Sequence, residues 1–209
     1  MKILALELSS SLGSIAVLRD QVVLRAMDWP NDRRDSAKFF EALNLIARDF
    51  GPADKIVVGV GPGSYAGTRI AISAAIGLQI AWKAELIGYP SICALDVSDS
   101  DFRVIGDARR QSFFAARILD RTIVEGPMLC TRDEMETRLA SMDSATAMYS
   151  SEKLGLSTAI PTAFPNAIRL GEMALANNPC VVAMPLQPMY LRDPHITEAK
   201  PKTLRTQNR

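Results

Sequence analysis

The sequence predicts an α/β protein built from two related halves, and three observations support this prediction. Short apolar runs bounded by turn residues alternate with longer segments in which apolar residues recur at helical spacing. The order of these elements in the first half begins again after a polar break at 99–101. With 209 residues, of which 48% are hydrophobic, the chain can bury a sizeable core.

Three strands are expected at the start of the chain. The apolar run 3–8 ends at the turn signal 9–13, a second run follows at 14–18, and a polar turn leads to a third at 22–27. Short runs separated by short turns are typical of an antiparallel meander.

An amphipathic helix is predicted at 36–49. Apolar residues such as Phe39 recur there at three- and four-residue spacing, with charged residues between them. Asp35 or Ser36 is the expected N-cap, and the Gly-Pro pair at 51–52 is the expected stop. The apolar stripe is typical of a helix that packs on a core, and the same pattern also suits an interface.

A glycine-rich loop connects the next strand to the next helix. A buried strand is predicted at 56–60, and a helix rich in small residues is predicted at 68–82. A strand at 86–88 and a helix at 91–98 complete the first half.

The second half repeats the order of the first. Its expected elements are strands at 102–106, 112–120 and 121–126, a helix opened by the capping box 131–134, a strand at 145–149 and a helix at 166–176. We therefore divide the chain into an N-terminal subdomain at 1–99, a C-terminal subdomain at 100–192 and a polar tail at 193–209.

The glycine-rich loop has the shape of an anion cradle without the residues of a Walker motif. A helix that begins directly after such a loop presents backbone N–H groups to an anion, but no Gly-Lys-Ser/Thr sequence follows here. Either the glycines allow the backbone to pack closely, or the loop binds an anion. The residues of the anion site would be Gly61, Gly63, Ser64, Gly67 and Arg69.

Catalytic chemistry has little support in the residues. His195 is the only histidine and lies in a proline-flanked segment, which leaves no histidine pair for a metal. Ser64 fits the spacing of a nucleophile elbow but lacks a histidine partner. Glu7 and Asp107 follow corresponding strands and either bind magnesium or simply cap their turns. We expect no catalytic residue and no metal site.

Charge gives no sign of an autonomous nucleic-acid-binding protein. Lys and Arg total 24 against 23 Asp and Glu, a net charge of +1. Contact between the isolated chain and a nucleic acid would therefore be weak and would depend on the basic residues of the tail. The pair Arg109-Arg110 suits a solvated turn better than an anion site.

The cysteines and the N-terminus indicate a cytoplasmic protein. Cys93, Cys130 and Cys180 are widely spaced and odd in number, which is typical of a reducing compartment. No apolar run is long enough to span a bilayer, and Glu7 interrupts the layout that a signal peptide would need. We expect no contact with a membrane.

Four motifs resemble the TsaB (YeaZ) family. They are ILALELSS at 3–10, GPGSYAGTRI at 61–70, DARR at 107–110 and PMYLR at 188–192. The resemblance covers nearly the whole chain, with Glu7 in the place where the family usually has Asp. It implies the actin/Hsp70/sugar-kinase-like fold, with two related βββαβα-type subdomains.

The resemblance also implies a non-catalytic scaffold subunit. A TsaD-like subunit would carry the metal, the nucleotide and the transfer step, and a TsaE-like ATPase would assist it. Such a complex adds threonylcarbamoyl to the adenosine beside the anticodon of ANN-decoding tRNAs, and this chain would meet tRNA only through the complex. No cofactor would be bound tightly by the chain itself, and ATP or ADP would be bound at the interface of the complex.

The alternative is a stand-alone ATP-dependent enzyme of the same fold, such as a small kinase. It is less well supported, because a phosphate-binding hairpin in the second half should carry glycine after its acid. Here Ala108 and Arg109 follow Asp107, and their side chains crowd the approach of a phosphate.

The helices at 36–49 and 68–82 are expected to dock the TsaD-like partner, and to form a homodimer when that partner is absent. The family resemblance suggests this surface, and the small residues of the second helix allow another backbone to approach closely. The sequence leaves the rotational phase of that helix open. The residues expected at the surface are Phe39, Leu43, Ile70, Ala71, Ala74, Ala75 and Leu78.

Overall fold

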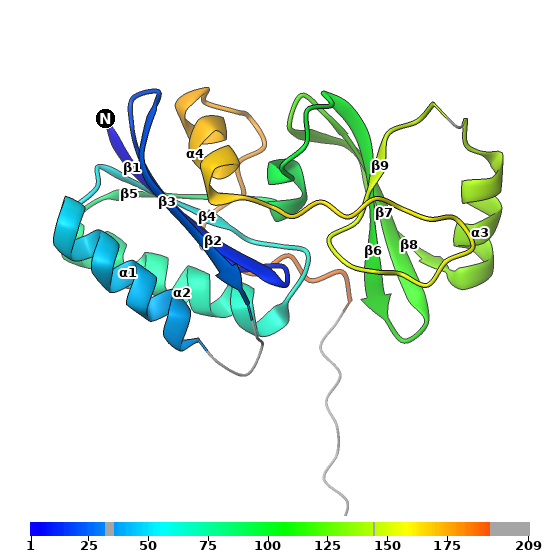
Figure 1. Ribbon diagram of the computed structural model, residues 1–209, viewed down its shortest axis with the longest axis horizontal. Helices are drawn as coiled ribbons and strands as arrows, with labels where there is room; N and C mark the ends of the chain where they lie inside the picture. The colour runs from blue at the N-terminus through cyan, green and yellow to red at the C-terminus, as the bar shows by residue number, and fades with distance from the viewer. Residues whose placement is uncertain (32–35, 144, 193–209) are drawn as a thin grey trace, which may run out of the picture.

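Two β-sheets, each covered by helices, form the part of the chain that the structure describes (Figure 1). The structure is a computed structural model and describes residues 1–31, 36–143 and 145–192. The expected contacts of the tail and the position of His195 lie outside these residues. The alternation of strands and helices confirms the α/β class.

The first sheet has the order β3-β2-β1-β4-β5. Strand β1 pairs antiparallel with β2 and parallel with β4, so the opening meander continues into parallel strands. The strands are β1 (Lys2–Glu7), β2 (Leu12–Arg19), β3 (Val22–Pro30), β4 (Lys55–Gly59) and β5 (Glu85–Tyr89).

Helices cover both faces of this sheet (Figure 1). One face packs against α1 (Ala37–Phe50) and α2 (Tyr65–Trp82), and the other packs against α4 (Ala167–Leu175). Side chains alternate along β1, so Leu4 and Leu6 point toward α1 and α2 while Ile3 and Ala5 point the other way. Because both faces are covered, β1 is apolar almost throughout.

The second sheet is smaller and has the order β8-β7-β6-β9. Helix α3 (Arg132–Ser141) packs against β7 and β8, and it begins at the capping box predicted from the sequence. The strands are β6 (Asp101–Arg109), β7 (Ser112–Leu119), β8 (Thr122–Thr131) and the two-residue β9 (Met148–Tyr149).

Helix α4 belongs to the second half by sequence but packs on the first sheet. The hydroxyl of Ser14 in β2 accepts a hydrogen bond of 2.9 Å from the Ala167 N–H at the start of α4. Gly171 lets the helix approach β2, since a Cβ there would lie 2.4 Å from a methyl carbon of Leu18. One hydrophobic cluster therefore contains side chains from both sheets and from α4.

The predicted helix at 91–98 is wrong beyond its first turn. The structure has a short 3-10 helix, η1 (Ser91–Ala94), after which Leu95 has extended backbone angles and pairs with Pro165. The guanidinium of Arg121 donates hydrogen bonds to the carbonyls of Leu95 and Val97. These carbonyls are therefore satisfied by a side chain, in place of the N–H groups of a following helical turn.

The other expected elements are present with shifted ends. Helix α2 begins at Tyr65, three residues earlier than predicted, because the side chain of Ser64 caps it. Strand β8 continues to Thr131, whereas the prediction ended it at 126. The division at 99/100 stays a prediction, since the cluster shared by the two sheets is compatible with one domain or two.

Candidate functional site

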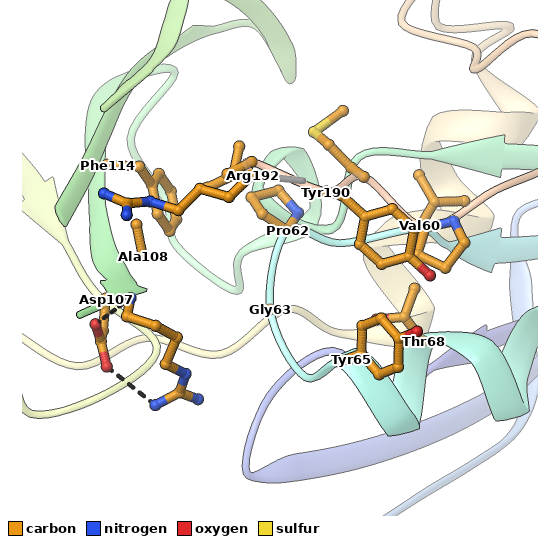
Figure 2. Close-up of a pocket in the computed structure, with 14 residues that line it drawn as sticks. Val60, Pro62, Gly63, Tyr65, Thr68, Asp107, Ala108, Phe114, Tyr190 and Arg192 are labelled. Atoms are coloured by element: carbon orange, nitrogen blue, oxygen red, sulfur yellow. Dashed lines mark hydrogen bonds and ion pairs between the residues drawn. The ribbon is translucent and has the colours of Figure 1, made fainter. Parts of the chain in front are cut away.

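The candidate site is a cleft of about 120 Å³ between the two sheets (Figure 2). The glycine-rich loop and the start of α2 form one wall, and the ends of β6 and β7 form the opposite wall. The segment 188–192 returns from the C-terminal side and lines the cleft with Met189, Tyr190 and Arg192. A smaller cleft of about 50 Å³ adjoins it and is lined by the β1–β2 turn and by Glu152.

The glycines of the loop allow close contact with the β1–β2 turn. A Cβ on Gly67 would lie 2.1 Å from the carbonyl oxygen of Leu8, and one on Gly63 would lie 2.2 Å from that of Ser9. Gly61 has φ +93, which a side chain disfavours. Close packing against the first turn therefore accounts for Gly63 and Gly67, and the positive φ accounts for Gly61. Binding of an anion by this loop stays a prediction.

Ser64 caps α2 and connects the loop to the β1–β2 turn. Its N–H donates a hydrogen bond of 2.6 Å to the Ser9 carbonyl. Its hydroxyl accepts from the Gly67 N–H at 3.3 Å, and its carbonyl accepts from the Thr68 N–H at 3.0 Å. Three amide groups that an anion would need thus already have partners. The buried hydroxyl therefore acts as the N-cap of α2.

Arg69 lies on the exposed side of α2, against an aromatic pair. Its guanidinium lies 5.0 Å from the centre of the Tyr65 ring and donates to the Tyr65 hydroxyl. The ring of Tyr65 faces that of Tyr190, with their centres 5.3 Å apart (Figure 2). This contact attaches the segment 188–192 to the start of α2.

Glu7 is buried completely and is absent from the residues that line the cleft. One carboxylate oxygen accepts a hydrogen bond of 2.6 Å from the Ser9 N–H, and the other has no partner. The missing Cβ of Gly59 gives that second oxygen its room, since a Cβ there would lie 1.7 Å from it. Burial raises the pKa of Glu7, because an ionised carboxylate loses its hydration there.

Asp107 faces the cleft but its carboxylate already has a partner. Arg109 donates to it from its N–H at 2.6 Å and from its guanidinium at 3.0 Å, as the dashed lines in Figure 2 show. The Asp107 N–H donates to Glu152 at 3.1 Å. Arg109, Arg110 and Gln111 all have left-handed backbone angles and form the exposed β6–β7 turn.

The two carboxylates considered for magnesium therefore differ in environment, one buried and one in the cleft. Among residues 1–31, 36–143 and 145–192, no group of three or more His, Cys, Asp or Glu side chains is placed to hold a metal ion. The same residues contain no helix with the length and apolar character needed to cross a membrane.

The expected docking residues are only partly at the surface. Phe39, Leu43, Ala71 and Ala75 are buried between α1, α2 and the first sheet, so they cannot contact a partner directly and are corrected to core residues. Ile70, Ala74 and Leu78 are half-buried and pack against the same core. The outer face of α2 instead exposes Ser73, Ile76, Gly77, Ile80 and Ala81.

Comparison with known proteins gives the family. Residues 39–168 match the family model described as TsaD, tRNA N6-adenosine threonylcarbamoyltransferase. The chain belongs to this family. An uncharacterized protein of Mycobacterium tuberculosis is 27% identical over 191 residues, covering 90% of this chain and 84% of the relative. An uncharacterized protein of Mycobacterium leprae is 29% identical over 151 residues, covering 72% of this chain and 40% of the relative.

Two solved structures share the fold of this chain. YeaZ from Pseudomonas aeruginosa has a TM-score of 0.64 at 17% identity, covering 83% of this chain and 91% of that one. An uncharacterized protein with similarity to peptidase YEAZ, also from Pseudomonas aeruginosa, has a TM-score of 0.65 at 20% identity and covers 91% and 99%. The resemblance to TsaB (YeaZ) proteins and the actin/Hsp70/sugar-kinase-like fold are confirmed.

Two features of the site were not apparent from the sequence. The segment 188–192 was noted only as a motif, and its Tyr190 proves to line the cleft. The aromatic and basic residues at the end of an apolar segment were a signal that it returns to a site. Arg121, which orders the backbone after η1, carried no such signal because its partners are carbonyl groups distant in the sequence.

Proposed function

We propose that this chain is a non-catalytic scaffold subunit for a TsaD-like catalytic partner. The complex, with a TsaE-like ATPase, would add threonylcarbamoyl to the adenosine beside the anticodon of ANN-decoding tRNAs. The match to the TsaD family model and the fold shared with YeaZ support a role in this tRNA modification. The TsaD-like subunit would supply the metal and the transfer step, and ATP or ADP would be bound at the interface.

The cleft supports the non-catalytic part of the proposal. Small-molecule pockets usually enclose about 300–1,000 Å³, whereas this cleft has about 120 Å³. The carboxylate of Asp107 is engaged by Arg109, and Glu7 is buried away from the cleft. A nucleotide would have to displace the ion pair and the Tyr65–Tyr190 contact, so the stand-alone kinase-like alternative is less favoured.

The exposed apolar residues on the outer face of α2 support the proposal that this face docks the partner. Ile80 is 75% exposed and Ile76 is 38% exposed, one turn apart on the same face. Gly77 and Ala81 lie beside them, so another helix could approach the backbone closely. Phe40 and Leu45 add exposed apolar area on α1, which covers the same face of the sheet (Figure 1). We assign this surface to the TsaD-like partner, and to a homodimer when the partner is absent.

The docking proposal is tested by charging the exposed face. Ile80→Arg should leave the circular dichroism spectrum unchanged and should weaken binding of the purified TsaD-like partner at least about tenfold in calorimetry, because a buried unpaired charge is costly at an interface. Val124→Arg is the matched control, since Val124 is 50% exposed on β8, far from α2 along the chain. Equal partner affinity of both variants and the wild-type chain would place the interface elsewhere.

The non-catalytic proposal is tested by reconstitution. The purified chain alone should neither hydrolyse ATP nor modify tRNA, and adding it to the TsaD-like and TsaE-like proteins should restore threonylcarbamoylation. Ile80→Arg should reduce this restored activity in proportion to its loss of binding. Steady ATP turnover by the isolated chain, abolished by Asp107→Ala, would instead support the kinase-like enzyme.

A further inference from the structure

Two cysteines far apart in the sequence face each other at the edge of the first sheet. The sulfur of Cys93, in η1, lies 3.8 Å from the sulfur of Cys180, which follows α4. The two residues are 87 positions apart in the chain. Cys93 is fully buried, whereas Cys180 is partly exposed, so a small oxidant can reach only the second sulfur directly.

Hydrogen bonds hold the backbone on both sides of this pair. The Cys180 N–H donates to the Asn178 side chain at 2.8 Å, and the Asn178 carbonyl accepts from the Tyr89 hydroxyl at 3.3 Å. The Arg121 guanidinium, which orders the carbonyls after η1, holds the segment that contains Cys93. Rotation of the side chains, with little movement of the backbone, has to bring the sulfurs to the bonding distance of about 2.05 Å.

We propose that Cys93 and Cys180 form a reversible disulfide, which makes this pair a redox modification site. With hydrogen peroxide as the oxidant, the Cys180 thiolate attacks one peroxide oxygen and becomes a sulfenic acid, and the hydroxide that leaves takes up a proton to become water. The Cys93 sulfur then attacks the Cys180 sulfur, its proton leaves with the hydroxyl group, and a second water is released. Two thiols and one peroxide thus give one disulfide and two waters.

The environment of the sulfurs fits this order of events. The neighbouring Cys93 thiol stabilises the Cys180 thiolate and lowers the pKa of Cys180 to about 6, while the same contact and burial raise the pKa of Cys93. The other ionisable groups close to the pair are the Tyr89 hydroxyl and the Arg121 guanidinium. Cys180 is therefore the attacking thiolate and Cys93 is the resolving thiol.

The disulfide would attach the C-terminal segment to the first half. After Cys180, the Val182 N–H donates to the Gly88 carbonyl at 2.9 Å, and the Met189 N–H donates to the Val60 carbonyl at 2.7 Å. These bonds carry Tyr190 into the cleft. A covalent bond at the start of this segment removes its freedom to detach, so oxidation should stabilise the arrangement that lines the cleft.

The experiment uses the full-length reduced chain treated with hydrogen peroxide, alkylated and digested without reductant for mass spectrometry. A peptide linking Cys93 to Cys180 should form, and dithiothreitol should reverse it. Cys130→Ser is the matched control, because Cys130 is a buried cysteine outside the pair, and it should keep the link. Cys180→Ser and Cys93→Ala should each lose the link. If one of them fails to fold, the other still tests the proposal.

Thermal unfolding of the oxidised and reduced chains provides a second measurement. Closing a loop of 87 residues should raise the melting temperature by about 5–10 °C, and this rise should be absent in Cys180→Ser. The proposal is overturned if peroxide produces only sulfinic acid at Cys180, links through Cys130, or links between chains. An unchanged melting temperature in a fully linked sample would overturn the effect on the C-terminal segment.

Discussion

The first hairpin turn of each half lies beside the same cleft, and the two turns differ in what they contact. The turn after β1 accepts the Ser64 N–H and packs against Gly63 and Gly67, so it is part of the interior. The turn after β6 is exposed, and its Arg109 bonds to Asp107 of the same hairpin. Similar strand orders have thus produced two different turns. The first is fixed by contacts with the glycine-rich loop and α2, and the second by an ion pair within its own hairpin.

The helices show the same difference. The first sheet is covered on both faces, by α1 and α2 on one side and by α4 on the other, whereas α3 is the helix that packs on the outer face of the second sheet within the described residues. Helix α4 comes from the second half of the chain but packs on the first sheet. The second half therefore stabilises the first sheet with a helix that does not cover its own strands. We infer that changes in the first hairpin will cost more stability than changes in the second.

The largest expected effect is that of Gly67→Ala. The new Cβ would lie 2.1 Å from the Leu8 carbonyl oxygen, so the loop and the first hairpin turn must separate. We expect the free energy of unfolding in urea to fall by at least about 2 kcal/mol. Gly77→Ala is the matched control on the same helix, because no atom lies within 4 Å of its new Cβ, and it should gain about 0.5–1 kcal/mol. Similar results for the two variants would remove the special role of the first turn.

A smaller effect is expected from Glu7→Gln, and it should depend on pH. Burial raises the pKa of Glu7 in the folded chain above the ordinary value of 4.5 for a glutamate. As pH rises through the interval between the unfolded and folded pKa values, the unfolded chain binds fewer protons than the folded chain, so stability falls. A rise of 1 in the pKa of the folded chain corresponds to a loss of about 1.4 kcal/mol in the free energy of unfolding. Glu7→Gln should lack this loss and should unfold at higher urea concentration than wild type at pH 8.

Glu134→Gln provides the control of opposite sign. The capping box at Thr131 lowers the pKa of Glu134, so its contribution is present above the unfolded pKa and is lost as pH falls. Above pH 5, this variant should leave unchanged the slope of the free energy of unfolding against pH. A wild-type slope of zero between pH 5 and pH 8 would show that Glu7 has ordinary acidity in the folded chain.

Much of this fold was predictable because it depends on local pattern. Alternating apolar runs gave the strands of both meanders, and the Thr131 capping box gave the start of α3. The prediction of a helix at 91–98 was wrong because a distant side chain, that of Arg121, donates hydrogen bonds to the carbonyls of Leu95 and Val97. No local pattern contains that information, because the two segments meet only after the sheets have formed.

The site was less predictable than the fold, and the docking helices show the reason. Phe39 and Ala71 are apolar residues on helices, a pattern that suits a core and an interface equally. Which face of each helix is buried depends on where the first sheet lies. In α2, the sheet buries Ala71 and leaves Ile80 exposed. Glu7 was recognised by its position at the end of the first strand, but its complete burial depends on Gly59 of a neighbouring strand.

The smallest effect is expected in the second turn, from Arg109→Gly compared with Arg110→Gly. Both arginines have left-handed backbone angles, with φ 66 and φ 53, which glycine adopts without strain. Each substitution should therefore gain up to about 1 kcal/mol of stability. Only Arg109→Gly also loses the ion pair with Asp107, whose side chains are 56% and 32% exposed.

A pair as exposed as this contributes less than about 1 kcal/mol and is screened by salt. The two variants should thus unfold within about 1 kcal/mol of each other in urea, and the gap should narrow when sodium chloride is added. If Arg109→Gly is instead less stable than wild type by more than about 2 kcal/mol, the ion pair anchors the second turn as firmly as backbone packing anchors the first. The two hairpins would then differ in the kind of contact that holds them but not in its strength.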